Sequence, residues 1–118
     1  MKIEYHLSTI ESYEQDEVKD FLEQHISTLH FVEGRCQAHK ESDVNLLKII
    51  CAVSKTHEPT GHCKYSTSLH LYLPIHNTQH VHVIKKEGHG LITTLHSTLE
   101  ALRHHLEHVI DKLKEKRA

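Results

Sequence analysis

The stretch ITTLHSTLEALRHHLEHVIDKL, residues 92–113, is the strongest structural signal in the sequence. Its apolar side chains recur every three or four residues, which places them on one side of an α-helix. The spacing predicts an amphipathic helix of about seven turns. The narrow apolar stripe consists of Ile92, Leu95, Leu99, Leu102, Leu106, Val109 and Leu113. Because such a stripe must be buried, the rest of the chain is expected to supply the surface that covers it.

Four upstream segments have the patterns of β-strands. Apolar and polar residues alternate in residues 1–7, 65–73 and 80–84, which is typical of strands with one buried face. Residues 46–54 are dense in aliphatic and β-branched side chains, as in a strand covered over much of its length. Turn-forming residues at 56–61 predict a hairpin between the second and third strands.

A first helix is predicted over residues 14–31, where apolar residues again recur at helical spacing. The sequence Ser12-Tyr13-Glu14-Gln15 resembles a capping box at its start, and Gly34 is expected to end it. Residues 35–45 form a polar connection of no clear period. The order strand, helix, three strands, helix predicts one α+β domain spanning residues 1–118.

The expected architecture is a four-stranded sheet with both helices packed on one face, since this arrangement buries every apolar stripe. The other sheet face is expected to be exposed. Its predicted side chains are Ser66, Ser68, His70, Tyr72, His80 and His82.

Composition indicates a folded domain in a reducing compartment. Apolar residues make up 37% of the 118 residues and charged residues 25%, unlike a disordered chain. The N-terminal segment has no apolar run of signal-peptide or membrane-span length. The three cysteines, Cys36, Cys51 and Cys63, are odd in number and lack CxxC spacing, which favours free thiols. We therefore expect a cytoplasmic protein.

Charge is distributed unevenly along the chain. The formal net charge is −2 with neutral histidines, but residues 1–39 are acidic, residues 40–86 are basic and residues 87–118 are balanced. An anionic partner is therefore expected to contact the middle or the end of the chain. The 15 histidines make the charge sensitive to mild acid, since an unperturbed imidazole titrates at about pH 6.5.

Element order and two short segments carry a resemblance to a known family. The segments are Cys51-Ala52-Val53-Ser54-Lys55 at the end of the second strand and Lys86-Glu87-Gly88-His89-Gly90-Leu91-Ile92 before the last helix. Together they resemble the ribosome hibernation-promoting and ribosome-associated inhibitor family, also called sigma-54 modulation proteins. The resemblance covers nearly the whole chain.

This resemblance implies a bacterial hibernation factor that binds the small ribosomal subunit near the tRNA and mRNA path and blocks translation in resting cells. A chain that ends at Ala118 would be a short form, without the second domain of long members. Where the family usually has an acidic residue and a tyrosine, this chain has Gly90 and Ile92. The family favours Lys or Arg at the positions of Ala101, His104, His108 and Lys112, of which only the last is basic at neutral pH.

Basic and histidine side chains after the acidic third are the candidate contacts to rRNA, because neutralising phosphates supplies most sequence-independent affinity. The candidate RNA-binding residues are Lys55, Lys64, His82, Lys85, Lys86, Arg103, His104, His108 and Lys112. A solvated surface of ordinary charge is the competing interpretation. If histidines replace lysines at the interface, RNA affinity is expected to rise as the pH falls.

Other functions remain open as alternatives. The His104, His105 and His108 cluster, and the pair His80 and His82, have spacings that can chelate transition metals, but they complete no recognisable zinc site. We therefore expect no resident metal or cofactor, with a His-rich metal-binding protein as one alternative. A protein–protein adaptor or homodimer is another, because the acidic first helix offers a surface and the heptad-like last helix resembles a coiled-coil seam. No catalytic motif is present, and we expect no enzyme activity.

Overall fold

The computed structural model describes residues 2–29, 48–75 and 78–115. These form the predicted series of strands and helices, with one additional short 3-10 turn. The elements are β1 (Lys2–His6), α1 (Ser12–His25), the 3-10 turn η1 (Ile26–Leu29), β2 (Lys48–His57), β3 (Cys63–Ile75), β4 (Thr78–Gly88) and α4 (Leu91–Glu115). The predicted connection at 35–45, the helix end at Gly34 and Cys36 lie outside the described residues. No helix in the described part of the chain is long and apolar enough to cross a membrane.

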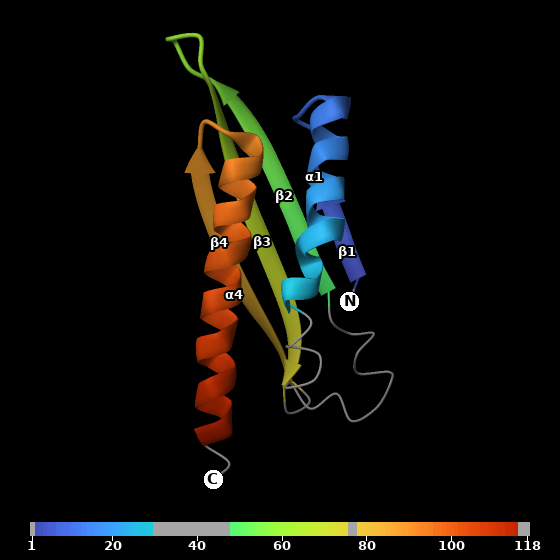
Figure 1. Cartoon of the computed structure of the whole chain (residues 1–118), viewed down its shortest axis with the longest axis vertical. Helices are drawn as coiled ribbons and strands as arrows, with labels where there is room; N and C mark the ends of the chain where they lie inside the picture. Colours follow the sequence, from blue (N-terminus) through green and yellow to red (C-terminus); the bar gives the residue numbers. More distant parts are fainter. Residues whose placement is uncertain (1, 30–47, 76–77, 116–118) are drawn as a thin grey trace.

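The four strands form one mixed sheet in the order β1-β2-β3-β4. β1 runs parallel to β2, and the other two pairs are antiparallel. Both helices lie on the same face of this sheet, with α1 alongside β1 and β2 and α4 alongside β3 and β4 (Figure 1). The α+β fold expected from the sequence is therefore confirmed.

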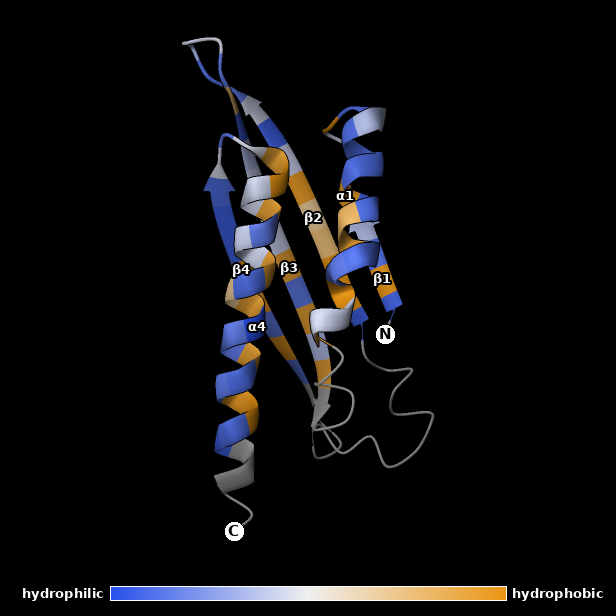
Figure 2. Cartoon of the chain, viewed as in Figure 1, coloured by the Kyte–Doolittle hydropathy of each residue, from blue (hydrophilic) through white to orange (hydrophobic). Residues whose placement is uncertain are grey.

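The core lies between the helices and the sheet. β3 contributes three fully buried leucines, Leu69, Leu71 and Leu73, and β2 contributes Ile49 and Cys51. Burial raises the pKa of the Cys51 thiol to about 12, so this side chain behaves as a small apolar residue. The apolar residues of α4 form a stripe along one side of the helix (Figure 2). Among the described residues, the helices thus cover one face of the sheet and leave the other open (Figure 1).

The buried stripe of α4 differs from the predicted one at its two ends. Leu91 and Ile110 are buried, whereas Ile92 and Val109 are only partly buried. The predicted stripe had a 3.5-residue period, but a straight α-helix has 3.6 residues per turn, so the line of contact drifts along a long helix. The side chain of Leu113 lies outside the described set.

The predicted open face is right for β3 and wrong for β4. Ser66, Ser68, His70 and Tyr72 lie on the open face, but His80 and His82 do not. The antiparallel register pairs His82 with Leu71 and His80 with Leu73, which places both histidines on the helix-covered face. Val81 and Val83 point to the open face instead and are 49% and 50% exposed. Pairing with β3, rather than local polarity, fixes the orientation of this edge strand.

The β2–β3 hairpin projects beyond the ends of the helices (Figure 1). Its turn is closed by the Gly61 N–H, which donates to the Glu58 carbonyl at 3.0 Å. Gly61 has a φ of 88°, a conformation that other residues rarely adopt. The turn predicted at residues 56–61 is therefore confirmed.

Candidate functional site

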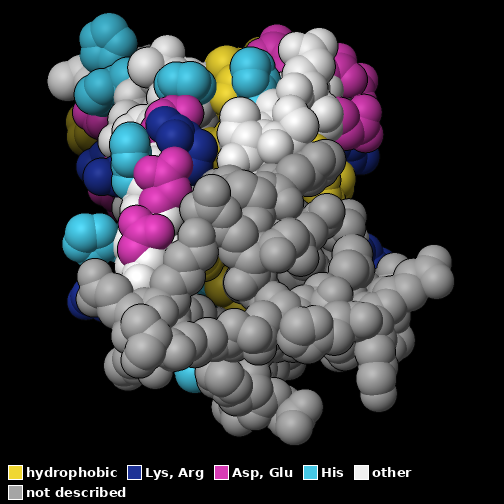
Figure 3. All heavy atoms as spheres, turned by 60° about the horizontal axis from the view of Figure 1, so that its bottom comes forward, with side chains coloured by type: hydrophobic (Ala, Val, Ile, Leu, Met, Phe, Trp, Pro, Cys, Tyr) yellow, Lys and Arg dark blue, Asp and Glu magenta, His cyan; other side chains and the backbone are white. Residues whose placement is uncertain are grey.

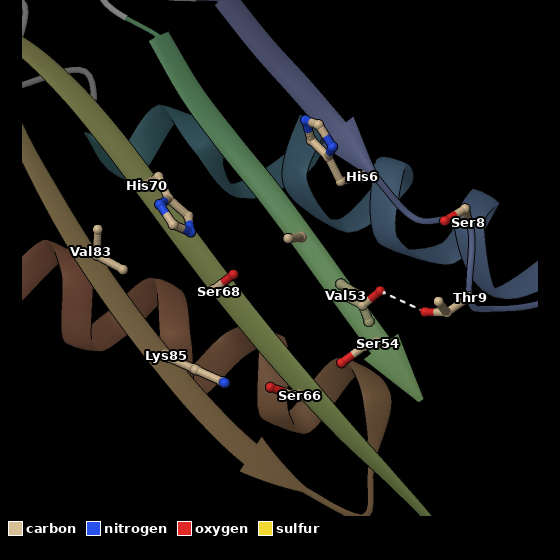
Figure 4. Close-up of a pocket in the computed structure, with 11 residues that line it drawn as sticks. His6, Ser8, Thr9, Val53, Ser54, Ser66, Ser68, His70, Val83 and Lys85 are labelled. Atoms are coloured by element: carbon tan, nitrogen blue, oxygen red, sulfur yellow. Dashed lines mark hydrogen bonds between the residues drawn. The ribbon is translucent and has the colours of Figure 1, made fainter. Parts of the chain in front are cut away.

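A shallow groove of about 450 Å³ crosses the open face of the sheet (Figure 4). It is lined by His6, Ser8, Thr9, Ala52, Val53, Ser54, Ser66, Ser68, His70, Val83 and Lys85. These residues come from all four strands and from the loop after β1. The groove is therefore a property of the assembled sheet rather than of one local motif.

Small side chains on the two central strands make the groove. In the β2–β3 register Ala52 lies opposite Ser68, and Ser54 lies opposite Ser66. The larger side chains of His6, on β1, and Lys85, on β4, stand on either side of them (Figure 4). Because successive residues of a strand point to opposite faces, the same strands present bulky apolar residues to the helices and small polar residues to the groove.

The loop after β1 is held at one end of the groove. The Thr9 hydroxyl donates to the Val53 carbonyl at 3.2 Å, and this hydrogen bond is drawn in Figure 4. The Ile10 N–H donates to the Leu7 carbonyl at 3.3 Å and tightens the same loop. These bonds fix where the hydroxyls of Ser8 and Thr9 meet the groove.

The lining suits an anionic or polar ligand. No lining residue is acidic, and serine and threonine hydroxyls, the Lys85 ammonium and two imidazoles supply hydrogen-bond donors. Within the described residues, no hydrogen bond joins the imidazoles of His6 or His70 to a groove hydroxyl. The groove therefore offers recognition groups without a nucleophile activated by a base.

Lysine exceeds acid on the open face. Glu4 is held by Lys48 at 3.4 Å and by His6 at 3.3 Å, and Glu87 is held by Lys64 at 3.1 Å. The hydrogen bond from His6, followed by the charge of Lys48, lowers the pKa of Glu4, so this carboxylate stays ionised. Lys85 makes no ion pair with any residue that the structure describes. It is thus available to an anion bound in the groove.

The sequence-predicted RNA-binding residues do not gather on one surface. Lys64 and Lys85 lie on the open face. Lys86 points to the opposite side of β4, because it is paired with the buried Thr67. The structure therefore separates two neighbouring lysines of the sequence onto different faces of the sheet.

Lys55 is mostly covered and contacts the buried Glu14. Its side chain is 13% exposed, and its ammonium is 3.2 Å from the Glu14 carboxylate. The Tyr65 hydroxyl donates a hydrogen bond to the same carboxylate, and the Glu11 N–H donates another at 3.1 Å. Burial raises the pKa of Glu14, but these hydrogen bonds and the charge of Lys55 together lower it by more, so the net pKa is below its ordinary value. Lys55 is therefore a structural partner rather than a surface cation.

The observed start of α1 differs from the predicted one, and the same hydrogen bonds explain the difference. Glu11, rather than Ser12, is the N-cap residue, and Glu14 is its capping-box partner. The helical pattern predicted for residues 14–31 is confirmed as far as Leu29, with the final turn in 3-10 geometry. Residues 30 and 31 lie outside the described part of the chain.

His82 is turned toward α4 instead of the open face. Its Nδ1 atom lies 2.9 Å from Nε2 of His105. Burial lowers the pKa of His82, and the nearby His105 and His80 lower it further. His82 is therefore neutral at physiological pH and contributes no positive charge to an RNA interface.

The outer side of α4 is mixed in charge. Arg103 is held by Glu100 at 2.7 Å and by Glu107 at 2.9 Å. His104 lies within 4 Å of both carboxylates, and His108 and Lys112 are exposed. Basic, acidic and histidine side chains are interspersed on the face that Figure 3 presents. Since acidic side chains surround and pair with Arg103, this part of the helix is a weaker site for phosphates than the acid-free groove.

The groove residues His6, Ala52 and Ser54 were absent from the sequence-based selection. Serine and alanine carry no charge signal, and their role depends on which strands become neighbours. The alternation of small residues in β2 and β3 was the available signal, but it required the register to be interpreted.

Comparisons with protein-family models, curated proteins and solved structures found no match.

Proposed function

We propose that this protein is a ribosome-associated translation inhibitor, or hibernation factor, that binds the small ribosomal subunit through rRNA phosphates. The observation that carries the proposal is the open sheet face, which combines an excess of lysine with an acid-free, hydroxyl-lined groove. The topology supports it, because the order of elements is the one on which the family resemblance rests. A cytoplasmic location follows from this proposal.

The open face provides the contacts that RNA backbone requires. The Lys85 ammonium supplies a charge for a phosphate, and the Ser66 and Ser68 hydroxyls supply donors beside it (Figure 4). Such contacts position the protein without reading sequence, so inhibition would result from occupying space on the subunit. Among the residues predicted from the sequence, Lys85 takes the main role in this interface, because Lys64 is paired with Glu87.

Co-sedimentation with purified small ribosomal subunits tests the proposal. Binding is expected at low salt and should weaken steeply as salt rises, because phosphate contacts release counterions. A second series at fixed salt and about pH 6 should show tighter binding than at about pH 7.5, since protonated imidazoles add positive charge. Absence of binding at low salt would overturn the proposal.

The exposed valines of β4 support a second candidate, a protein–protein adaptor or homodimer. Val81 and Val83 are half-exposed on a strand at the edge of the sheet. Edge strands present unpaired backbone groups that another chain can use. Sedimentation velocity over a range of concentrations tests the dimer, and a purely monomeric protein excludes it.

A further inference from the structure

A pair of histidines from two elements meets between the sheet and the last helix, away from the groove. Nδ1 of His82, on β4, and Nε2 of His105, on α4, are 2.9 Å apart. Their ring centroids are 5.0 Å apart, and the rings are inclined at 57°. Two histidines separated by 23 positions in the sequence thus present ring nitrogens to one another.

The two imidazoles differ in their exposure to solvent. His82 is partly buried, and its Nε2 atom is enclosed without a hydrogen-bond partner among the described residues. His105 is exposed, so the contact between the rings can be reached from solvent. Packing of α4 on β4 therefore holds one imidazole in place and leaves the other free to adjust.

The separation of the two nitrogens matches that of neighbouring ligands on one metal ion. Imidazole nitrogens bind first-row metals at about 2.0–2.1 Å, so two of them at a right angle are about 2.8–3.0 Å apart. At a tetrahedral angle the same nitrogens would be about 3.3 Å apart. The observed 2.9 Å is now spanned by a hydrogen bond, so both nitrogens are close enough to reach one ion, and the distance is nearer to the right-angle value used by square or octahedral Cu²⁺ and Ni²⁺ sites.

We propose that His82 and His105 form a two-imidazole site for Cu²⁺, and more weakly for Ni²⁺, that fastens α4 to β4. In the described part of the chain no third histidine, cysteine or carboxylate joins them, so water would complete the coordination. With one N–H on each ring, the N–H that lies between the rings would move to the far nitrogen of its own ring, and no proton would be released. The ion would then link the two elements through both nitrogens.

Copper titration of the untagged full chain, purified without a nickel column, tests the site. We expect one site stronger than the background of scattered histidines, an upward shift of the melting temperature with Cu²⁺, and nitrogen couplings from two imidazoles in the electron paramagnetic resonance spectrum. Cu²⁺ should bind more tightly than Ni²⁺ or Zn²⁺, as it does at nitrogen sites in general.

Matched variants locate the site. His105→Gln, at an exposed position, and His82→Asn should each weaken copper binding by about tenfold or more and abolish the melting shift. His104→Gln and His108→Gln should bind as the parent does, although these residues form the chelating pair with helical spacing that the sequence suggests. Circular dichroism of the metal-free variants checks that each one folds.

Several results would contradict the proposed copper site. Loss of binding in His104→Gln or His108→Gln, with His105→Gln unaffected, would place copper on the helix surface and overturn the proposal. Binding unchanged in every variant, or Zn²⁺ bound as tightly as Cu²⁺, would also overturn it. None of these results depends on ribosome binding, so this proposal and the proposed function stand or fall separately.

Discussion

The two faces of the sheet come from the same strands, yet they have opposite chemistry. On the covered face, β3 presents Leu69, Leu71 and Leu73, all fully buried. On the open face, the intervening residues Ser68, His70 and Tyr72 remain accessible. Because the side-chain direction alternates at every residue, one strand can specify the core and a binding surface independently. Changes to one face should therefore alter stability, and changes to the other should alter recognition.

Substitutions at adjacent positions of β3 provide the most severe test of this division. Leu69→Ala should reduce the free energy of unfolding by about 2–5 kcal/mol, because it leaves a cavity beneath the helices. Ser68→Ala, one residue away on the groove side, should change it by no more than about 0.5 kcal/mol. Urea denaturation of the two variants measures both values. Comparable losses would show that the faces are not energetically independent.

Glu14, on α1, is a charged side chain buried against the covered face, and its removal should have an intermediate effect. Glu14→Gln should cost about 1–3 kcal/mol, because the buried acceptor for Tyr65 and Lys55 is weakened. The matched change Glu17→Gln, on the exposed side of α1, should have little effect. Urea denaturation of both variants at neutral pH gives the comparison.

The ionisation of Glu14 should also make stability depend on pH. The pKa of Glu14 is lower in the folded protein than its ordinary value of 4.5, so the unfolded chain takes up the proton first as the pH falls. Its contribution to stability is therefore complete above this ordinary value and is lost as the pH falls through the folded value. Glu14→Gln should flatten this part of the stability profile, and Glu17→Gln should not. An unchanged acid profile in Glu14→Gln would contradict the role of the network.

Local patterns were sufficient for most of the fold, because long periodic segments such as residues 92–113 depend little on their neighbours. They failed where tertiary pairing decides the outcome. His82 is polar, yet the register with Leu71 turns it toward α4. Lys55 looked like a surface cation until α1 placed Glu14 beside it. The groove was predictable only in part, because Ser66 and Ser68 become a site only when Ala52 and Ser54 lie beside them.

Two neighbouring lysines of β4 give the most delicate test, since they differ in the face they occupy and not in charge. Lys85 lines the groove, whereas Lys86 points to the helix side. Lys85→Gln should weaken subunit binding and reduce the slope of log affinity against log salt by about 1, the signature of one lost phosphate contact. Lys86→Gln removes the same formal charge, so any general electrostatic effect is common to both variants. Co-sedimentation across a salt series measures the two slopes. Equal slopes for the two variants would show that RNA responds to net charge alone and that the open face is not the contact surface.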